Sequence, residues 1–485
     1  MRIRHYLQAA ALAVIPLFSA GASASPWAEV GDNQLRSDIQ LLAQSGVGND
    51  LTTHWPLPWR SIVSRLGKAT LADRPAAVRL AAARVLARAR SETQQGASGS
   101  LMLDITNRTG LVRGFDSLGR GEGQAQVSLG YNLSNISARL SVGVFSRDSE
   151  RNRYKTMFDG SYVAADIGGA RVYAGYLDHW WGPGQISALS LSNNARPMPQ
   201  VGIQRSSTTA SSWPVLHWLG PWQVEFLLGY LDGPRIEPDT YYNALRVTVN
   251  PAPDLEIGFA RTQQFCGRGH PCEPIRDYFN FANDNRSANN TNDQGLFDIK
   301  YSPLIGGVPT QFYMQLMNED SSPFVHSGTS HLFGASIFLP TGNPVRLTVE
   351  YTDTIPTNNI FSFGDVRHGL AYNNGGYPDG MRYRGRTLGF SLDSDSRLLS
   401  LQSSWMDLGG RFYELSYHRA DISHLLNIYG NSVTGVPVRV NLGEARLTLP
   451  LLGMKVDLAG RYQDNQARPR RGPAVSVEVR IRIDS

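Results

Sequence analysis

The sequence predicts an all-β transmembrane barrel that follows a small N-terminal α-helical bundle. Three observations favour this fold class: apolar and polar residues alternate with a period of two over most of the chain, an export signal precedes them, and tight connections alternate with long ones. Many runs are close to the ~9–11 residues with which tilted strands cross a bilayer. We therefore expect a signal peptide at 1–24, a periplasmic helical bundle at 25–98 and an outer-membrane β-barrel at 99–485.

The first residues have the features of a secretory signal peptide. A positive start is followed by an apolar run over 7–20 and by the small residues Ala-Ser-Ala at 22–24, which a signal peptidase requires. Pro16 interrupts the run, which is shorter than the ~20 residues of a spanning helix. We therefore expect export and cleavage near Ser25, with a retained membrane anchor as the alternative.

Helical periodicity characterises the segment that follows. Leu35, Ile39 and Leu42 recur at helical spacing, a second short pattern covers 59–66, and a third covers 74–95. The third pattern is rich in alanine and carries five arginines along a polar face. We expect that face to be solvated, and contact with acidic lipid or glycan is the alternative.

From about residue 101 the apolar period is two. In VSVEVRIRID, at 475–484, valine and isoleucine occupy one face, and serine, glutamate, arginine and aspartate occupy the other. The chain contains roughly 16 to 19 such runs. A stack of soluble sandwiches shows the same alternation. A single closed barrel is favoured for an exported chain, because closure removes the unpaired strand edges that lipid could not solvate.

The connections between these runs predict the orientation of the barrel. Long segments are expected outside the cell and tight turns in the periplasm. The long ones are 148–158, 179–199, 265–294, 318–329 and 355–385, and the tight ones include 167–169, 251–253, 340–344 and 394–396. This order of long and tight connections holds up to residue 396 and fails beyond residue 400.

Composition limits the partners and cofactors. Charged residues make up 18% of the chain, below the ~25% of an ordinary soluble domain. A net charge of +5 over 485 residues permits an acidic partner and gives no reason to expect nucleic acid. Cys266 and Cys272, in CGRGHPC, predict a local disulfide in an oxidising compartment. Zinc binding together with His270 is the alternative, although a fourth ligand is missing; we expect neither metal nor cofactor.

The loop DHWWGPGQISALSLSNNARPMP, at 178–199, is the first candidate binding site. Trp180 and Trp181 offer flat apolar faces on which a sugar ring can stack. The directional polar groups of the loop are Asp178, Asn193, Asn194 and Arg196. An outward-facing loop of this kind suits a polysaccharide, since sugar hydroxyls need fixed donors and acceptors. The alternative is that the tryptophans fold into the lumen or anchor at the membrane interface.

The loop RHGLAYNNGGYPDGMRYRGRTLG, at 367–389, is the second candidate. It interleaves tyrosines with arginines, namely Arg367, Tyr372, Tyr377, Arg382, Tyr383, Arg384 and Arg386. Arginine pairs well with carboxylates, so an acidic polysaccharide would suit this surface. The alternative is a network inside the lumen in which these arginines meet the acidic residues of the barrel itself.

Five motifs occur in order along the chain: SPWAEVGDNQLRSDIQLLAQSG, THWPLPW, YLDHWWGPGQISALSLSNNARPMPQVGIQR, LGPWQVEFLLGYLDGPR and MRYRGRTLG. Over nearly the whole mature chain, the sequence resembles the Wzi-type capsule assembly proteins of the bacterial outer membrane. The resemblance implies a barrel of about 18 antiparallel strands with a helical bundle at its periplasmic end. It also implies lectin-like, non-catalytic binding of capsular or related exopolysaccharide at the cell surface. The matching motif positions are Trp180, Trp181, Gly182, Pro183, Asn193, Asn194, Arg196 and Pro197, and Arg382, Tyr383, Arg384, Gly385 and Arg386.

Two other functions stay open. A barrel of this size can enclose an aqueous channel and act as a diffusion porin or as a channel associated with polysaccharide export. An outer-membrane hydrolase needs a nucleophile held beside a base, and His326-Ser327 and Ser330-His331 are weak candidates because proximity in sequence does not establish this pairing. The expected partners are the polysaccharide and outer-membrane lipid. Polysaccharide export machinery is a further candidate partner, and a contact with the helical bundle stays open.

Overall fold

The computed structural model describes most of residues 25–484. The segments that it leaves out are 1–24, 49–50, 117–118, 149–155, 273–290, 320–327, 340, 342–343, 359–365, 425–429, 467–471 and 485. The expected signal peptide therefore lies outside the described residues. Parts of four of the long connections and the pair His326-Ser327 lie outside them as well.

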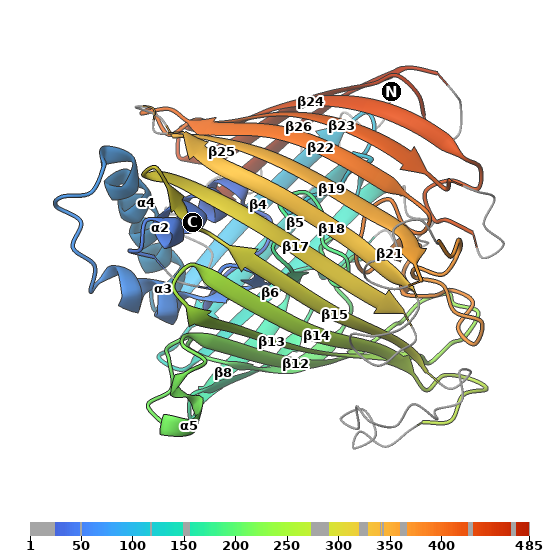
Figure 1. Ribbon diagram of the computed structural model, residues 1–485, viewed down its shortest axis with the longest axis horizontal. Coiled ribbons are helices and arrows are strands. Elements are labelled where there is room, and N and C mark those ends of the chain that lie inside the picture. The colour runs from blue at the N-terminus through green and yellow to red at the C-terminus, as the bar shows by residue number, and fades with distance from the viewer. Residues whose placement is uncertain are drawn as a thin grey trace.

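One closed antiparallel barrel forms the body of the molecule (Figure 1). In the described part of the chain its wall has eighteen strands: β4 (Gly96–Thr106), β5 (Gly121–Asn132), β6 (Ile136–Asp148), β8 (Tyr162–Ile167), β9 (Ala170–Gly175), β11 (Gln200–Arg205), β12 (Trp222–Tyr230), β13 (Tyr241–Ala252), β14 (Leu255–Phe265), β15 (Asn292–Tyr301), β17 (Val308–Glu319), β18 (Thr329–Leu339), β19 (Val345–Thr357), β22 (Arg397–Met406), β23 (Phe412–Ile422), β24 (Val438–Leu451), β25 (Met454–Gln463) and β26 (Ala474–Asp484). The two-residue strands β7 (Thr156–Met157) and β16 (Leu304–Ile305) add to it. β26 pairs with β4, which closes the wall and confirms the predicted fold class.

Three helices pack together at one end of the barrel, hereafter the helical end; the opposite end is the loop end (Figure 1). They are α2 (Asn33–Gln44), α3 (Trp59–Leu66) and α4 (Ala76–Thr93), and they are accompanied by the short strands β1 (Trp27–Ala28), β2 (His54–Trp55) and β3 (Leu57–Pro58). Asp32 caps α2 by accepting a hydrogen bond from Leu35 N at 3.1 Å. The apolar faces of the helices share one buried cluster. Among the described residues, no helix is both long enough and apolar enough to span a membrane.

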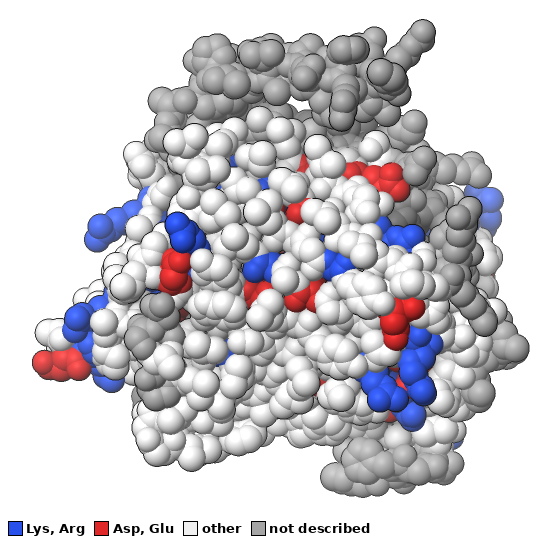
Figure 2. Space-filling model, turned by 90° about the horizontal axis from the view of Figure 1, so that it is seen from above, with Lys and Arg blue, Asp and Glu red and all other residues white. Residues whose placement is uncertain are grey.

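The two faces of the wall differ in chemistry, because successive residues of a strand point to opposite sides. On β26, Val475 is 62% exposed and Val477 is 55% exposed on the outside, whereas Glu478 and Arg480 are buried. Figure 2 shows an outer surface that is mostly uncharged over the strands. An apolar outer face is what a barrel in contact with lipid requires.

Two connections fold back into the lumen and fill it. We define the lumen plug as residues 176–199, between β9 and β11, and residues 366–396, between β19 and β22. Apolar plug residues such as Leu189 and Phe390 form one buried cluster with wall residues such as Leu332. The plug contains three short strands, β10 (Trp180–Trp181), β20 (Arg382–Tyr383) and β21 (Arg386–Thr387).

The expected tight turn at 394–396 is wrong. Among the described residues the wall has no strand between β19 and β22, so 358–396 is one connection at the loop end. Asn431 Nδ2 donates to the main-chain oxygen of Ser394 at 2.7 Å, inside the plug. The apolar alternation at 388–392 resembles a strand in sequence, but these residues pack within the plug. The expected order of connections fails beyond residue 400 for this reason.

Candidate functional site

The tryptophan pair of the WWGPG motif lies inside the barrel. Trp180 and Trp181 are both 0% exposed, and β10 pairs with β2 of the N-terminal segment. The Trp180 ring packs edge-on against Phe115 at a centroid distance of 5.6 Å. The Trp181 ring packs edge-on against His54 at 5.7 Å and His179 at 5.8 Å. The expectation that both rings face outward is therefore wrong, and the alternative of a fold into the lumen is what the structure shows.

The Gly-Pro-Gly turn after the tryptophans fits closely against the wall. Gly182 N donates to Thr53 O at 2.9 Å, and Gln315 Nε2 on β17 donates to Trp181 O at 2.8 Å. Gly182 has a φ of +142°, and a Cβ there would lie 2.5 Å from the Gln315 side-chain nitrogen. Only glycine combines this φ with so close an approach. The motif position Gly182 therefore shapes the plug.

Two charged side chains hold the plug at residues 184–187. Arg36 on α2 donates to Gly184 O at 2.6 Å and to Gln185 O at 3.3 Å. Glu350 on β19 accepts hydrogen bonds from the main-chain nitrogens of Gln185, at 2.6 Å, and Ser187, at 2.7 Å. Because buried main-chain groups must be satisfied, these contacts fix an irregular segment in the lumen.

Asn193 and Asn194 connect parts of the plug. Asn193 Nδ2 donates to Phe115 O, and Asn194 Nδ2 donates to Thr387 O, both at 2.9 Å. Both asparagines are buried. Their amides therefore join the 176–199 segment to two other inward-folded segments, and neither amide faces solvent.

Asp178 and Arg196 belong to a charged cluster in the lumen. Arg196 pairs with Asp159 at 2.8 Å, and Arg120 lies 3.7 Å from Asp178. Arg120 also donates to Asn194 O at 3.1 Å. Burial raises the pKa of Asp178 to about 6; Arg120 opposes this shift and Asp159 adds to it. A polar cavity of about 200 Å³ adjoins the cluster, and its lining includes Glu29, Arg120, Arg139, Asp159, Asp178 and Asn193.

The second predicted loop is largely internal as well. The Arg382 guanidinium binds Asp393 through two hydrogen bonds of 2.8 and 2.6 Å. Burial alone would raise the pKa of Asp393, but Arg382 holds it below its usual value. The Tyr372 hydroxyl donates to Leu189 O at 2.6 Å, which joins the two halves of the plug. These contacts match the predicted alternative, a lumen network between arginines and acidic residues.

Arg384 and Arg386 are half-buried, and Tyr383 before them is 2% exposed. Tyr383 OH donates to Asp232, and Arg384 Nη2 pairs with the same carboxylate at 2.6 Å. The side chain of Asp232 is 35% exposed. Arg386 is half-buried and lies 3.4 Å from Asn194 Oδ1. In the pair formed by Arg384 and Asp232, the carboxylate is therefore partly open to solvent, whereas the Arg384 side chain is only 10% exposed.

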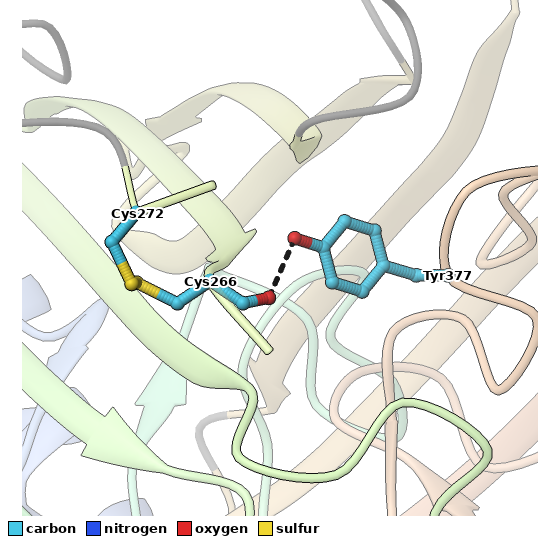
Figure 3. Close-up of a disulfide and its surroundings, with 3 residues drawn as sticks. All are labelled: Cys266, Cys272 and Tyr377. Atoms are coloured by element: carbon cyan, nitrogen blue, oxygen red, sulfur yellow. Dashed lines mark hydrogen bonds between the residues drawn. A yellow bond between two sulfur atoms is a disulfide. The ribbon is translucent and has the colours of Figure 1, made fainter. Parts of the chain in front are cut away.

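The disulfide joins Cys266 to Cys272 at the end of β14 (Figure 3). The Tyr377 hydroxyl donates to Cys266 O at 2.9 Å, so this small loop is docked on the plug. His270 stacks on the Tyr377 ring at a centroid distance of 4.3 Å. Within the described residues, no group of three or more His, Cys, Asp or Glu side chains could hold a metal ion.

The exposed part of the candidate site is small and polar. Arg367 is exposed, and its Nε donates to Asn358 Oδ1 at 2.6 Å. The His368 ring stacks with His424 at 5.9 Å, and His368 Nδ1 lies 3.6 Å from Asp395. Burial raises the pKa of Asp395. Arginine, imidazole rings and nearby carboxylates thus meet at the loop end.

Sequence reasoning missed the residues that hold the plug in place, namely Arg36, Arg120, Asp159, Glu225, Asp232 and Glu350. Glu225 on β12 accepts hydrogen bonds from His54 at 3.1 Å and from His179 at 3.0 Å, so it joins the N-terminal segment to the plug. A signal was present for Glu225 and Glu350, because both alternate with outward apolar residues in their strands and so had to face the lumen.

A closed barrel with an apolar outer wall and a filled lumen is the fold of an outer-membrane β-barrel protein. The family model described as capsule assembly protein Wzi matches residues 92–467, and the chain belongs to this family. Wzi of Escherichia coli, described as an outer membrane protein involved in group 1 capsule assembly and a carbohydrate-binding β-barrel, has a similar structure. The TM-score is 0.82 at 21% identity, over 94% of this chain and 98% of that one.

A curated relative is known from Klebsiella pneumoniae and is described as an uncharacterized 55.8 kDa protein in the cps region. It is 28% identical over 317 residues, which are 63% of this chain. The matched part spans about 60% of the length of that relative.

Proposed function

We propose that this protein is a non-catalytic outer-membrane barrel that binds capsular or related exopolysaccharide at its loop end and holds it at the cell surface. The observation that carries the proposal is the lumen plug, whose buried apolar cluster joins the segments at 176–199 and 366–396 to the wall. A rigid plug presents fixed side chains to the outside, which a binding protein needs. Family membership and the carbohydrate binding of E. coli Wzi support the same function.

In the proposed orientation, the helical end lies in the periplasm and the loop end lies outside. Most turns at the helical end are short, such as 168–169 and 452–453, with 206–221 as a longer exception, whereas the two connections that form the plug start from the loop end. This asymmetry is typical of outer-membrane barrels. The helical bundle is then placed where export machinery can reach it, and such a contact stays a prediction.

The residues proposed to touch polysaccharide are the exposed residues Arg367, His368 and His424, together with the partly exposed carboxylate of Asp232 and its ion-pair partner Arg384. They combine donors, acceptors and flat rings, which suit sugar hydroxyls and ring faces. The buried members, including Trp180, Trp181 and Tyr372, act by holding the plug in shape. Each surface contact is weak, so retention depends on many repeats of one polymer engaging many barrels.

A pull-down with the polymer of the producing organism tests this proposal. The variant combines Arg367→Ala with Arg384→Gln, and purified barrels in nanodiscs are compared with the wild type. Arg411→Ala is the matched control, because Arg411 is an arginine with a 60% exposed side chain at the helical end, paired with Asp407 at 3.8 Å. The loop-end variant should lose most bound polymer and the control should lose none. Equal retention by all three proteins contradicts the proposed site.

The two alternatives are tested separately. A diffusion porin would give a steady large conductance in a planar bilayer, whereas a filled lumen should be silent. For a hydrolase, Ser330-His331 is the pair that lies within the described residues; both residues are buried, on β18. Ser330 is 0% exposed and His331 is 3% exposed, so a substrate in solution does not reach this pair.

A further inference from the structure

The connection between β11 and β12 carries large apolar side chains that point away from the protein. Trp213 is 58% exposed, Val215 is 61% exposed and Trp218 is 66% exposed. They surround the short helix α5 (Pro214–His217), which projects from the helical end of the barrel (Figure 1). We term residues 209–219 the aromatic hook. Three neighbouring large apolar side chains in water would be unfavourable and require a covering partner.

Hydrogen bonds within the aromatic hook define its conformation. Its turns are closed by hydrogen bonds from Leu216 N to Trp213 O at 3.0 Å and from Gly220 N to His217 O at 3.1 Å. Ser211 Oγ accepts from Trp213 N at 3.1 Å. Because the hook satisfies these polar groups internally, its apolar side chains are left to face outward in a fixed arrangement.

The base of the hook is fixed to the wall. Arg205 Nη1 donates to Thr209 O at 2.8 Å and to Trp222 O at 2.9 Å, and its guanidinium lies 4.1 Å from the Trp222 ring centroid. Gly220 has a φ of +63°, and a Cβ at this residue would lie 1.9 Å from Asn250 O. The hook is therefore held at a set position relative to β11, β12 and β13.

The surface next to the hook shows what covers it. Val201 and Ile203, on β11, are 52% and 46% exposed on the outer wall, which is the lipid-facing surface. The chain runs from this wall directly into the hook. Residues 206–221 contain no Asp, Glu, Lys or Arg, so no charge opposes entry into an interface. Tryptophan is enriched where a membrane meets water, because its ring is apolar and its N–H is polar.

We infer that the aromatic hook inserts into the phospholipid headgroup region of the leaflet at the helical end and anchors the barrel there. The occupant is phospholipid, since the hook continues an apolar wall that already faces lipid. Insertion at one fixed point would set the depth and tilt of the barrel beyond what its apolar band alone specifies. This inference rests on the position of the barrel in a membrane and is independent of polysaccharide binding.

Tryptophan fluorescence of the full-length protein in phospholipid nanodiscs tests the inference. The hook signal is the emission of the wild type minus that of the variant with Trp213→Phe and Trp218→Phe. Lipids brominated close to the headgroup should quench most of this difference emission, lipids brominated deep in the chain should quench less, and aqueous iodide should have little effect. Trp405→Phe gives the reference signal, since Trp405 is a half-buried residue of β22 near the same end.

The opposite quenching pattern overturns the inference. If iodide quenches the hook signal and brominated lipids do not, the hook faces water and its partner is a periplasmic protein or a second barrel. The phenylalanine variant should bind polysaccharide as the wild type does. The loop-end variant should lose polymer binding and keep normal quenching of the hook signal. The two measurements therefore test polysaccharide binding and membrane insertion independently.

Discussion

Two tryptophan pairs in this chain have opposite surroundings. Trp180 and Trp181 are 0% exposed in the lumen, whereas Trp213 and Trp218 are 58% and 66% exposed at the helical end. Both pairs lie in connections that contain proline and lack regular wall structure. They differ in how the polar groups of the backbone are satisfied. The first connection is held in its middle by wall side chains such as Glu350, whereas the second takes a wall contact at its base, from Arg205, and closes its own turns beyond it. A loop thus enters a lumen where the wall supplies hydrogen-bond partners.

Removing the buried tryptophan pair and the exposed pair in separate variants should give the largest difference in stability. Trp180→Ala with Trp181→Ala deletes buried rings, which costs about 3–5 kcal/mol each, so the plug should loosen and the barrel should conduct in a planar bilayer. Trp213→Ala with Trp218→Ala removes exposed rings and should change the free energy of unfolding by only about 0.5 kcal/mol. Thermal unfolding in detergent measures both. Equal destabilisation by the two double variants would contradict the described surroundings.

The barrel itself was predictable from the sequence because the constraint on it is local. A wall strand must alternate between lipid and lumen, and 475–484 shows that alternation without reference to any partner. At 388–392 the same alternation does not indicate a wall strand, because the apolar side chains of this segment pack inside the plug. A period of two indicates that one face of a segment is apolar, and it does not indicate whether lipid or the plug covers that face. The expected turn at 394–396 was wrong for that reason.

The candidate site was less predictable, since its motif residues act through partners far away in sequence. Asn194 binds Thr387, and Tyr372 binds Leu189. A spacing of nearly two hundred residues leaves no signal in either loop alone. The disulfide between Cys266 and Cys272 could be predicted because both partners lie within seven residues.

A smaller effect is expected from the arginine that reaches the plug from the helical bundle. Arg36→Met keeps an apolar stem but removes the donor of Gln185 O, at a cost of about 1–3 kcal/mol for a buried acceptor left unsatisfied. Gly184 O keeps the hydrogen bond from Trp180 Nε1 at 3.1 Å. Hydrogen exchange of the amides at 182–187 should accelerate. Arg60→Met is the matched control, because the Arg60 side chain is 59% exposed. Faster exchange in both variants alike would show that the contact of Arg36 is not the cause.

Protonation of Asp178 should tune the plug more gently. Its pKa rises from 3.8 to about 6 in the folded protein, so between these values the folded state holds more protons than the unfolded state. The stability of the plug should therefore increase as pH falls from 7 towards 4, and Asp178→Asn should flatten that part of the profile. The difference in melting temperature between wild type and variant across this range is the measurement. Parallel profiles would exclude a contribution from this carboxyl group.

The smallest effect on stability, and the sharpest test of the exposed pair, comes from Gly220→Ala. The new Cβ would lie 1.9 Å from Asn250 O at a φ of +63°, so the hook must move. The displaced segment buries little surface, so the melting temperature should fall only slightly. Quenching of the hook signal by headgroup-brominated lipid should fall. Gly453→Ala is the control, because Gly453 lies in the turn between β24 and β25 with a φ of +79° and nothing within 4 Å of its added Cβ. This control carries the backbone strain without the displacement, so a fall in quenching there as well would trace the effect to strain and not to the position of the hook.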